Sequence, residues 1–577
     1  MKFFKELFGN LKFAWKYAKK EKLKVYGFMI CGIFHIIISV IVPVVSAKII
    51  VNLTNSKLRQ VLFVALVLFF VENIRNVINF LARYFSQITY RETFIRLQFD
   101  LGKAILRLKN SSIDENSSGV FIQRLTNDTS KIADVFNLLN YQLAELLTNI
   151  GIFGAILIID LRVFLMCIIS VALIGFFEQK RISVQNEKDK IFRKENENVS
   201  GFIGELVRGV RDIKMLNAEK SFLKELNEKL IHLNKTRYDM GKVNRNYNLF
   251  ISFLRDLSDL IMITLLVYLI YIGDMSIAIS LVVHNYMSRV SWVIGNFSYL
   301  LEGLKDFNLS TSRINEIINS KKYPKESFGK KHLDSVAGNF EFKNVSFGYD
   351  DKLLFKNLSF KVKSHSTIAF VGKSGSGKTT IFNLLCKMYD YKSGSITIDG
   401  EDIMELDKDS IRKHITIISQ NPYIFNLSIR DNLRLVKDNL TDEEMVEACR
   451  VACLEDFINA LPDKYDTVVG EGGVSLSGGQ RQRLAIARTL VQKTEIILFD
   501  EATSALDNVT QSHIQEAIDN LQGNYTIMII AHRLSTIINS DKILFLDEGC
   551  IVAEGSHEEL LKSCKDYKLL YEAEIEK

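Results

Sequence analysis

The chain has 577 residues, which is too long for one ordinary hydrophobic core, so two or three domains are expected. Its mean hydropathy is slightly positive although 24% of its residues are charged, which predicts a membrane-embedded half joined to a water-soluble half. The net charge of +6 is accounted for by residues 1–24, where eight Lys minus two Glu gives +6. The rest of the chain is therefore neutral, which argues against a nucleic-acid-binding surface.

The seven cysteines show no metal-binding pattern. Cys449 and Cys453 are four residues apart, but no second pair of Cys or His lies nearby to complete a zinc site. We expect reduced thiols and no structural metal.

Residues 1–24 form the first predicted segment, an interfacial elbow. Trp15, Tyr17 and several Lys recur there at a spacing typical of an amphipathic helix lying on the inner leaflet. The following apolar run lacks a small-residue cleavage site and continues to full spanning length, so no signal peptide is expected.

Residues 25–320 are predicted to be an all-α transmembrane domain with long cytoplasmic helical extensions. Apolar stretches long enough to span a bilayer occur at about 25–49, 60–82, 136–159, 161–178, 249–272 and 276–301. The connections after the second and fourth stretches are long and rich in Arg and Lys, whereas the others are short. This alternation predicts cytoplasmic N- and C-termini in a multi-pass protein of the cytoplasmic, or inner, membrane. The Lys- and Ile-rich, Pro-poor composition is typical of an AT-rich bacterial genome.

Polar residues inside these stretches recur on single helix faces. A charge at the bilayer centre costs at least ~2.5 kcal/mol, so such faces should border a wet central cavity or pair with one another, as Arg255 and Asp259 would at i, i+4. His35, Ser39, Ser46 and Glu145 mark the first and third stretches more weakly. The candidate cavity residues are Glu72, Asn76, Asn79, Arg255, Asp259, Asn285 and Arg289.

A linker is predicted at 321–338, and residues 339–577 are predicted to form a nucleotide-binding domain. The strand-like run 367–371 leads directly into a Gly-rich loop, and a helical pattern follows it. This context identifies a phosphate-binding loop, in which backbone N–H groups surround the phosphates, Lys378 neutralises their charge and the Thr379 hydroxyl reaches Mg²⁺. The loop and the start of its helix comprise Gly372, Lys373, Ser374, Gly375, Ser376, Gly377, Lys378, Thr379 and Thr380.

An apolar run at 496–499 predicts a buried parallel strand that ends at Asp500. Asp500 is placed to hold Mg²⁺, directly or through water, and Glu501 to polarise the attacking water as general base.

In these motifs the chain resembles the ATP-binding cassette (ABC) superfamily, and as a whole it resembles an exporter-type half-transporter. The resemblance implies six spans followed by an α/β P-loop NTPase domain with an antiparallel β subdomain and an α-helical signature subdomain. It implies that Tyr349 stacks on adenine, that Gln420 contacts Mg²⁺ and that His532 senses the γ-phosphate. It further implies a signature that acts on the ATP of a partner subunit (Leu476, Ser477, Gly478, Gly479, Gln480) and a linking D-loop (Ser504, Ala505, Leu506, Asp507). Coupling helices are implied near 116–123 and 215–222.

The function expected from this resemblance is ATP-driven export of an amphipathic small molecule, drug or peptide by alternating access, with ATP and Mg²⁺ as cofactors. The expected partners are the lipid bilayer, the cargo and a second half-transporter in a homodimer or heterodimer, without nucleic acid. An importer of the same architecture and an ATP-gated regulator or channel that does not pump remain alternatives. A soluble ABC ATPase acting on DNA or ribosomes is disfavoured by the six predicted spans.

Overall fold

The computed structural model describes residues 2–54, 58–116, 118–290, 293–319, 322–349, 352–470, 473–500, 508–530 and 537–575. The chain divides into two compact units. The first comprises Met1–Leu106 and Ser117–Lys322, and the second comprises Arg107–Asn116 and Tyr323–Lys577.

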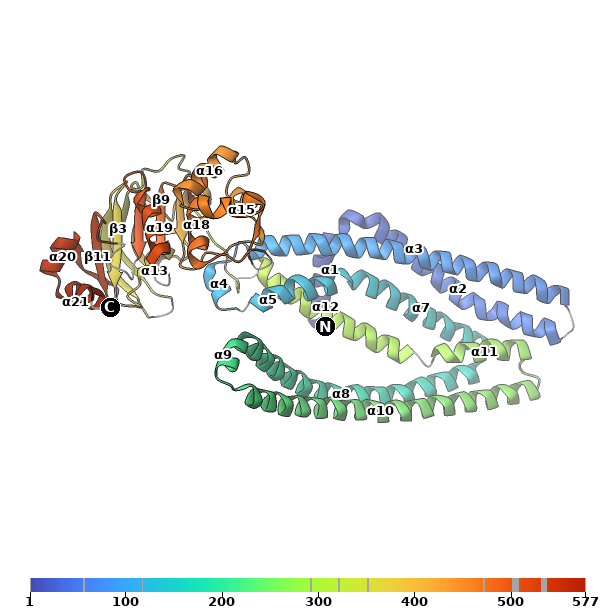
Figure 1. Cartoon of the computed structure of the whole chain (residues 1–577). Helices are drawn as coiled ribbons and strands as arrows, with labels where there is room; N and C mark the ends of the chain where they lie inside the picture. The colour runs from blue at the N-terminus through green and yellow to red at the C-terminus, as the bar shows by residue number, and fades with distance from the viewer. Residues whose placement is uncertain are drawn as a thin grey trace. The chain divides into compact units, whose positions relative to one another are not determined.

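The described part of the first unit is helical throughout (Figure 1). Three of its helices, α3, α8 and α10, have 48, 48 and 53 residues. At 1.5 Å per residue each is about 70–80 Å long, more than twice the ~30 Å hydrocarbon core of a bilayer, so each extends well into water. The helices are α1 (Lys2–Ala18), α2 (Lys22–Thr54), α3 (Leu58–Ile105), α5 (Ser118–Gln123), α6 (Thr129–Ala133), α7 (Val135–Ile159), α8 (Leu161–Arg208), α9 (Val210–Met215), α10 (Glu219–Tyr271), α11 (Ile277–Val290) and α12 (Val293–Asn319), with short 3₁₀ and π turns at Lys19–Glu21 and Arg124–Asp128.

Four stretches of the described helices are long and apolar enough to cross a membrane: Lys5–Ile49, Leu58–Ile105, Ser118–Ile159 and Leu161–Arg208. They contain the first four predicted spans. The fifth predicted span lies in α10, where Arg255, Asp256 and Asp259 interrupt the apolar sequence. The sixth falls on α11 and α12, on either side of residues 291–292.

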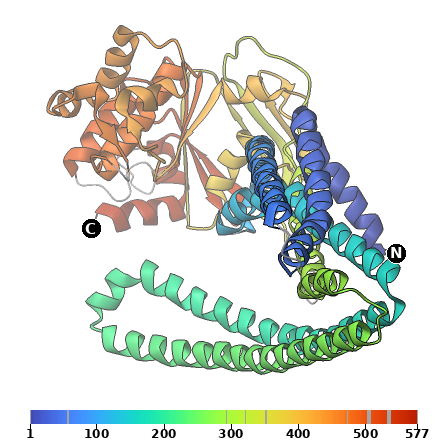
Figure 2. The same ribbon diagram turned by 90° about the vertical axis from the view of Figure 1, so that its right-hand side faces the viewer.

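Helices α8 and α10 lie side by side and are joined through α9 at one end (Figures 1 and 2). At the other end, the guanidinium of Arg162 contacts Asp160 at 2.8 Å and Asp274 at 2.9 Å. Asp160 is the single residue between α7 and α8, Arg162 lies in the first turn of α8, and Asp274 lies in the α10–α11 connection, so these two short connections meet. A buried cluster from α2, α7, α8, α10 and α11 packs the same region of the bundle, with Ile152, Cys167 and Met262 fully buried.

The described residues of the second unit form three sheets. A six-stranded sheet has the order β12-β11-β3-β10-β9-β6 and is parallel except for the β11–β12 pair. A four-stranded antiparallel sheet has the order β2-β1-β4-β5, and β7 pairs with β8. The strands are β1 (Phe340–Phe347), β2 (Phe355–Val362), β3 (Thr367–Gly372), β4 (Ser393–Ile398), β5 (Glu401–Asp402), β6 (Ile415–Ile418), β7 (Leu427–Ser428), β8 (Val468–Val469), β9 (Ile496–Asp500), β10 (Thr526–Ile530), β11 (Lys542–Asp547) and β12 (Cys550–Gly555).

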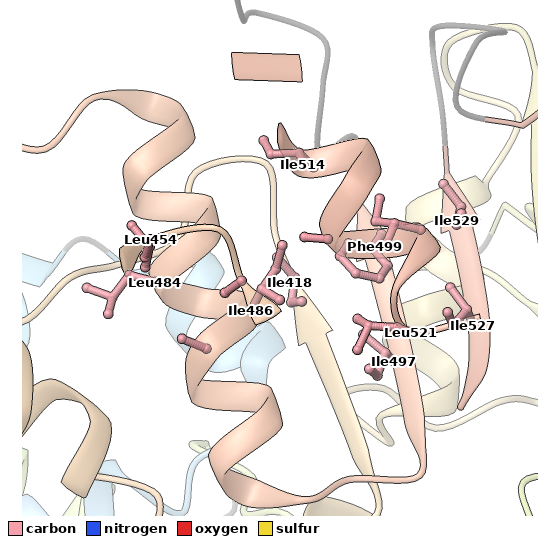
Figure 3. Packing of buried hydrophobic residues seen from close by; sticks show 14 of the residues in the cluster. Ile418, Leu454, Leu484, Ile486, Ile497, Phe499, Ile514, Leu521, Ile527 and Ile529 are labelled. Atoms are coloured by element: carbon pink, nitrogen blue, oxygen red, sulfur yellow. The ribbon is translucent and has the colours of Figure 1, made fainter. Parts of the chain in front are cut away.

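Helices cover the parallel sheet because its strands are apolar on both faces. On one side, Leu484 and Ile486 of α18 and Ile514 of α19 pack with Phe499 and Ile527 of the sheet (Figure 3). A second cluster fills the space between the two larger sheets. The helices of this unit are α4 (Asn110–Asp114), α13 (Lys378–Leu385), α14 (Lys408–Arg412), α15 (Ile429–Arg434), α16 (Asp442–Val451), α17 (Glu455–Asn459), α18 (Gly478–Gln492), α19 (Asn508–Asp519), α20 (His557–Ser563) and α21 (Lys565–Ile575), with a 3₁₀ turn at Lys464–Asp466.

The predicted fold class is confirmed: a helical membrane half precedes an α/β half that contains a parallel and an antiparallel sheet. The short helix α4 belongs to the second unit, whereas α5 belongs to the first. The coupling role expected near 116–123 and 215–222 remains a prediction.

Candidate functional site

The Gly-rich loop joins β3 to α13, as the sequence predicts. Gly377, the residue before α13, has φ +101°, and a side chain there would meet the Phe355 ring at 2.5 Å. Only glycine fits this combination of backbone and neighbour without strain. The helix N-terminus is thereby left open toward the loop, the arrangement that suits an anion.

Lys378 is buried, with a side chain that bends back across the loop. Its ammonium group donates to the carbonyl oxygens of Gly372 at 2.8 Å and Lys373 at 2.9 Å. Because these backbone groups fix the ammonium, the positive charge is preorganised where the loop would hold phosphate.

A cavity of about 500 Å³ lies over the loop and collects several of the predicted residues. The Tyr349 side chain is 54% exposed, so much of its ring surface is accessible at the cavity, while its hydroxyl lies 3.0 Å from the Thr380 hydroxyl. Lys352, Leu353 and Leu354 also line the cavity, but they were not identified from the sequence because they belong to no recognised motif. The lining residues are Tyr349, Lys352, Leu353, Leu354, Ser374, Gly375, Gly377, Lys378, Thr379 and Thr380.

Two of the residues expected to bind Mg²⁺ are in contact at the start of α13. The Thr379 hydroxyl donates to Asp500 Oδ1 at 3.2 Å, from the first turn of α13 to the end of β9. Gln420 follows β6, which pairs in parallel with β9, so it emerges at the same carboxyl edge of the sheet. A hydroxyl and a carboxylate fit the preference of Mg²⁺ for hard oxygen ligands. The described residues thus suit the ion that the resemblance implies.

The expected general base and phosphate sensor lie outside the described residues, as does the D-loop. These are Glu501, Ser504, Ala505, Leu506, Asp507 and His532. The strands that lead to them are adjacent, because β9 and β10 pair in parallel with Asp500 opposite Ile530.

The signature forms the start of α18, a helix of 15 residues. Ser477 caps it: its hydroxyl accepts from the Gln480 N–H at 3.2 Å, and the Gln480 side chain accepts from the Ser477 N–H at 2.8 Å. Leu476 is buried in the core beside this helix, whereas Gly478 and Gly479 form its first turn. The capped N-terminus of α18 carries the positive end of the helix dipole, so it is a favourable place for a negatively charged group.

The candidate cavity residues of the membrane unit lie on α3, α10 and α11. Glu72 pairs with Arg75 of the same helix, Asn76 is exposed, and the Asn285 amide donates to the Leu281 carbonyl one turn earlier. Arg255 and Asp259 lie on α10, and the side chain of Arg289 is outside the described residues. Of these residues, Asn79 lines a polar cavity of about 450 Å³ together with the weakly marked His35 and Glu145.

Comparison with known proteins agrees with this architecture. The family model of the ABC transporter transmembrane region matches residues 25–294, and that of the ABC transporter matches residues 355–504. The chain is 33% identical over 522 residues to the ATP-dependent lipid A-core flippase of Haemophilus influenzae, covering 86% of this chain and 85% of the relative. It is 28% identical over 580 residues to YgaD of Bacillus subtilis, a protein named for multidrug export, covering 98% and 99%. It is 36% identical over 387 residues to the beta-(1→2)glucan export protein NdvA of Rhizobium johnstonii, covering 66% and 64%.

Proposed function

The chain belongs to the ABC transporter family and is an ATP-hydrolysing transporter of the exporter type. From that premise we propose that it exports an amphipathic small molecule, drug or peptide across the cytoplasmic membrane. The observation that carries the proposal is the fusion, in one chain, of spanning helices to a cassette whose cavity has Lys378 and Thr379 in its wall and Asp500 bonded to Thr379.

Each site residue has a proposed part in hydrolysis. Tyr349 stacks on adenine, the loop N–H groups and Lys378 hold the phosphates, and Glu501 takes a proton from the attacking water while His532 contacts the γ-phosphate. Thr379, Asp500 and Gln420 would hold Mg²⁺, which supplies charge neutralisation at the phosphate oxygens. The chain has a suitable residue for each of these roles.

A second half-transporter is part of this proposal. Ser477 and Gly479 lie at the capped N-terminus of α18. In the proposed assembly this N-terminus closes on the ATP held by the partner. The D-loop residues 504–507 would link the two ATP sites. Since Glu501 and the signature are both intact in the sequence, two copies of this chain would have two competent sites. A heterodimer with another half-transporter is the alternative.

Export is favoured over import by the relatives, whose names describe a flippase and two export proteins. Their named cargoes differ, so the names do not select one cargo. The expected orientation, with both termini in the cytoplasm, would place ATP and cargo loading on the same side. Uptake of cargo into inside-out vesicles on addition of external ATP would support export. ATP-driven efflux from these vesicles would indicate an importer. No net movement of cargo would indicate a regulator or channel that does not pump.

The decisive experiment is ATPase activity of the chain purified alone into lipid nanodiscs. Glu501→Gln should lower turnover by roughly 10²–10⁴-fold, the usual contribution of a general base, while ATP still binds. Glu516→Gln, an exposed carboxylate on α19, is the matched control and should leave turnover unchanged. Full activity in Glu501→Gln contradicts the assignment of the base. No turnover from folded wild-type protein contradicts the homodimer and points to a different partner subunit.

A further inference from the structure

Two cavities of opposite character adjoin each other in the membrane unit. The polar cavity of about 450 Å³ lies among α2, α3 and α7. An apolar groove of about 800 Å³ lies among α1, α2 and α7, and its wall includes Trp15, Met29, Ile33, Phe136, Leu143 and Leu147. Four residues line both: Phe28, Gly32, Asn140 and Ala144. The cavities are therefore neighbours across one shared wall.

Gly32 and Asn140 lie against each other in this shared wall. A Cβ atom at Gly32 would lie 2.8 Å from Asn140 Oδ1, so the amide occupies the space that any other residue at position 32 would fill. The Asn140 amide also donates to the Phe28 carbonyl at 3.4 Å, a long and therefore weak hydrogen bond. The Asn140 amide therefore borders both the groove and the cavity, and the hydrogen bond shown from it to α2 is a weak one.

The chemistry of the two spaces matches the two ends of an amphiphile. The groove is walled by apolar side chains, several of them half exposed, such as Met29 and Ile33. The polar cavity contains one basic group, Arg83, and one acidic group, Glu145, whose carboxylate lies 4.0 Å from His35 Nε2. Both sizes fall in the range of sites that hold one small ligand, ~300–1,000 Å³.

We propose that groove and cavity form one binding site for a single-chain zwitterionic amphiphile, with its hydrocarbon chain in the α1–α2–α7 groove and its head group between Arg83 and Glu145. The Asn140 side chain moves aside for the occupant, which passes over Gly32. The groove is lined in part by α1, the helix predicted to lie on the inner leaflet. The identification of the occupant as cargo rests on the proposed transport function. Its binding to this site does not depend on that function.

Trp15 lines the groove and reports on occupancy directly. The chain has two Trp, so Trp292→Phe leaves Trp15 as the only tryptophan emitter. Lysophosphatidylethanolamine with a brominated chain is titrated into this variant in nanodiscs of unlabelled lipid. Saturable quenching of Trp15 is expected. Quenching that rises only in proportion to the probe in the bilayer would mean contact with surrounding lipid alone and would overturn the proposal.

Two substitutions separate the parts of the site. Gly32→Leu fills the shared wall and should weaken probe binding roughly tenfold or more, whereas Gly154→Leu on α7, where a Cβ would meet no atom within 4 Å, should not. Glu145→Gln preserves size but removes the charge, so it should weaken the zwitterionic probe roughly tenfold and leave a brominated monoacylglycerol unchanged. Equal effects of Glu145→Gln on both probes would refute the head-group assignment.

The ATPase activity of the same samples distinguishes the two proposals. Saturable quenching without any turnover would retain the binding site and count against the transport function of the chain alone. Normal turnover without saturable quenching would retain the transport function and remove this site.

Discussion

The Tyr389 hydroxyl donates to Asp114 Oδ2 at 2.5 Å, which joins the nucleotide-binding fold to α4, the short helix in the connection between α3 and α5. The Tyr389 ring also packs edge-on against Tyr349, with centroids 5.1 Å apart. Burial and the hydrogen bond to Asp114 raise the pKa of Tyr389, so the phenol stays protonated as the donor. One aromatic ring therefore separates α4 from the wall of the nucleotide cavity.

A double-mutant cycle should measure this link. Tyr389→Phe removes only the hydroxyl and Asp114→Asn only the charge, so the coupling free energy of unfolding should be about 0.5–1.5 kcal/mol because the pair is partly exposed. Unfolding midpoints of the four proteins in nanodiscs provide the measurement. Strict additivity would show that the contact contributes nothing to stability.

The neighbouring pair of Lys109 and Asp390 predicts a pH dependence. The two groups lie 2.6 Å apart. Burial alone would raise the pKa of Asp390, but the hydrogen bond from Lys109 and the charge of Lys387 outweigh it and lower this pKa below its ordinary value of 3.8. A carboxylate whose folded-state pKa is lowered stabilises the protein above its ordinary pKa, and this contribution is lost as the pH falls through the folded-state value.

The stability difference between wild type and Asp390→Asn should therefore be constant from neutral pH down to about pH 5 and shrink as the pH falls below 4. Unfolding midpoints across this range measure it. Asp438→Asn, in the connection between α15 and α16, is the control for general acid sensitivity. A stability difference between wild type and Asp390→Asn that grew as the pH fell would contradict the lowered pKa of Asp390.

Two glycines of the phosphate-binding loop should respond differently to alanine. Gly375 has φ +83°, and a Cβ atom there would have no neighbour within 4 Å, so Gly375→Ala should cost only the backbone strain, about 1–2 kcal/mol. Gly377→Ala adds a clash with Phe355 at 2.5 Å and should cost about 1–3 kcal/mol more. Thermal unfolding with nucleotide-binding titrations would rank them, and equal losses would show that the ring yields freely.

The position of the Lys378 ammonium predicts a loss of hydrolysis rather than of folding. Lys378→Ala should lower ATPase activity by roughly 10²–10³-fold, the usual cost of one electrostatic stabiliser. Lys361→Ala is the matched control, because that side chain lies on β2 in the antiparallel sheet, is 73% exposed and pairs with Glu341 at 2.9 Å. Similar losses in both variants would argue against a specific role for the Lys378 charge.

The sequence by itself determined the order of the parts and the chemistry of the ATP site. Apolar stretches of spanning length precede a strand, a Gly-rich loop and a helix, and these patterns are local: each depends on residues within one or two turns or strands. The strand that ends at Asp500 could be predicted for the same reason. The reciprocal cap between Ser477 and Gln480 was found only in the structure. The position of Glu501 and His532 remains a prediction, since both lie outside the described residues.

Only the tertiary structure decided which distant residues meet. Polar periodicity selected Asn79 on its own helix, but it cannot tell which helix faces approach, and the folded chain brings Asn79 together with His35 and Glu145 around one polar cavity. A cargo-binding role for Arg255, Asp259 and Asn285 remains a prediction. Likewise, no pattern marks Tyr389 as the partner of Asp114, because their 275-residue separation in the chain is closed only by folding. Local patterns specify elements and loops, whereas contacts between elements depend on packing, which a single sequence does not display.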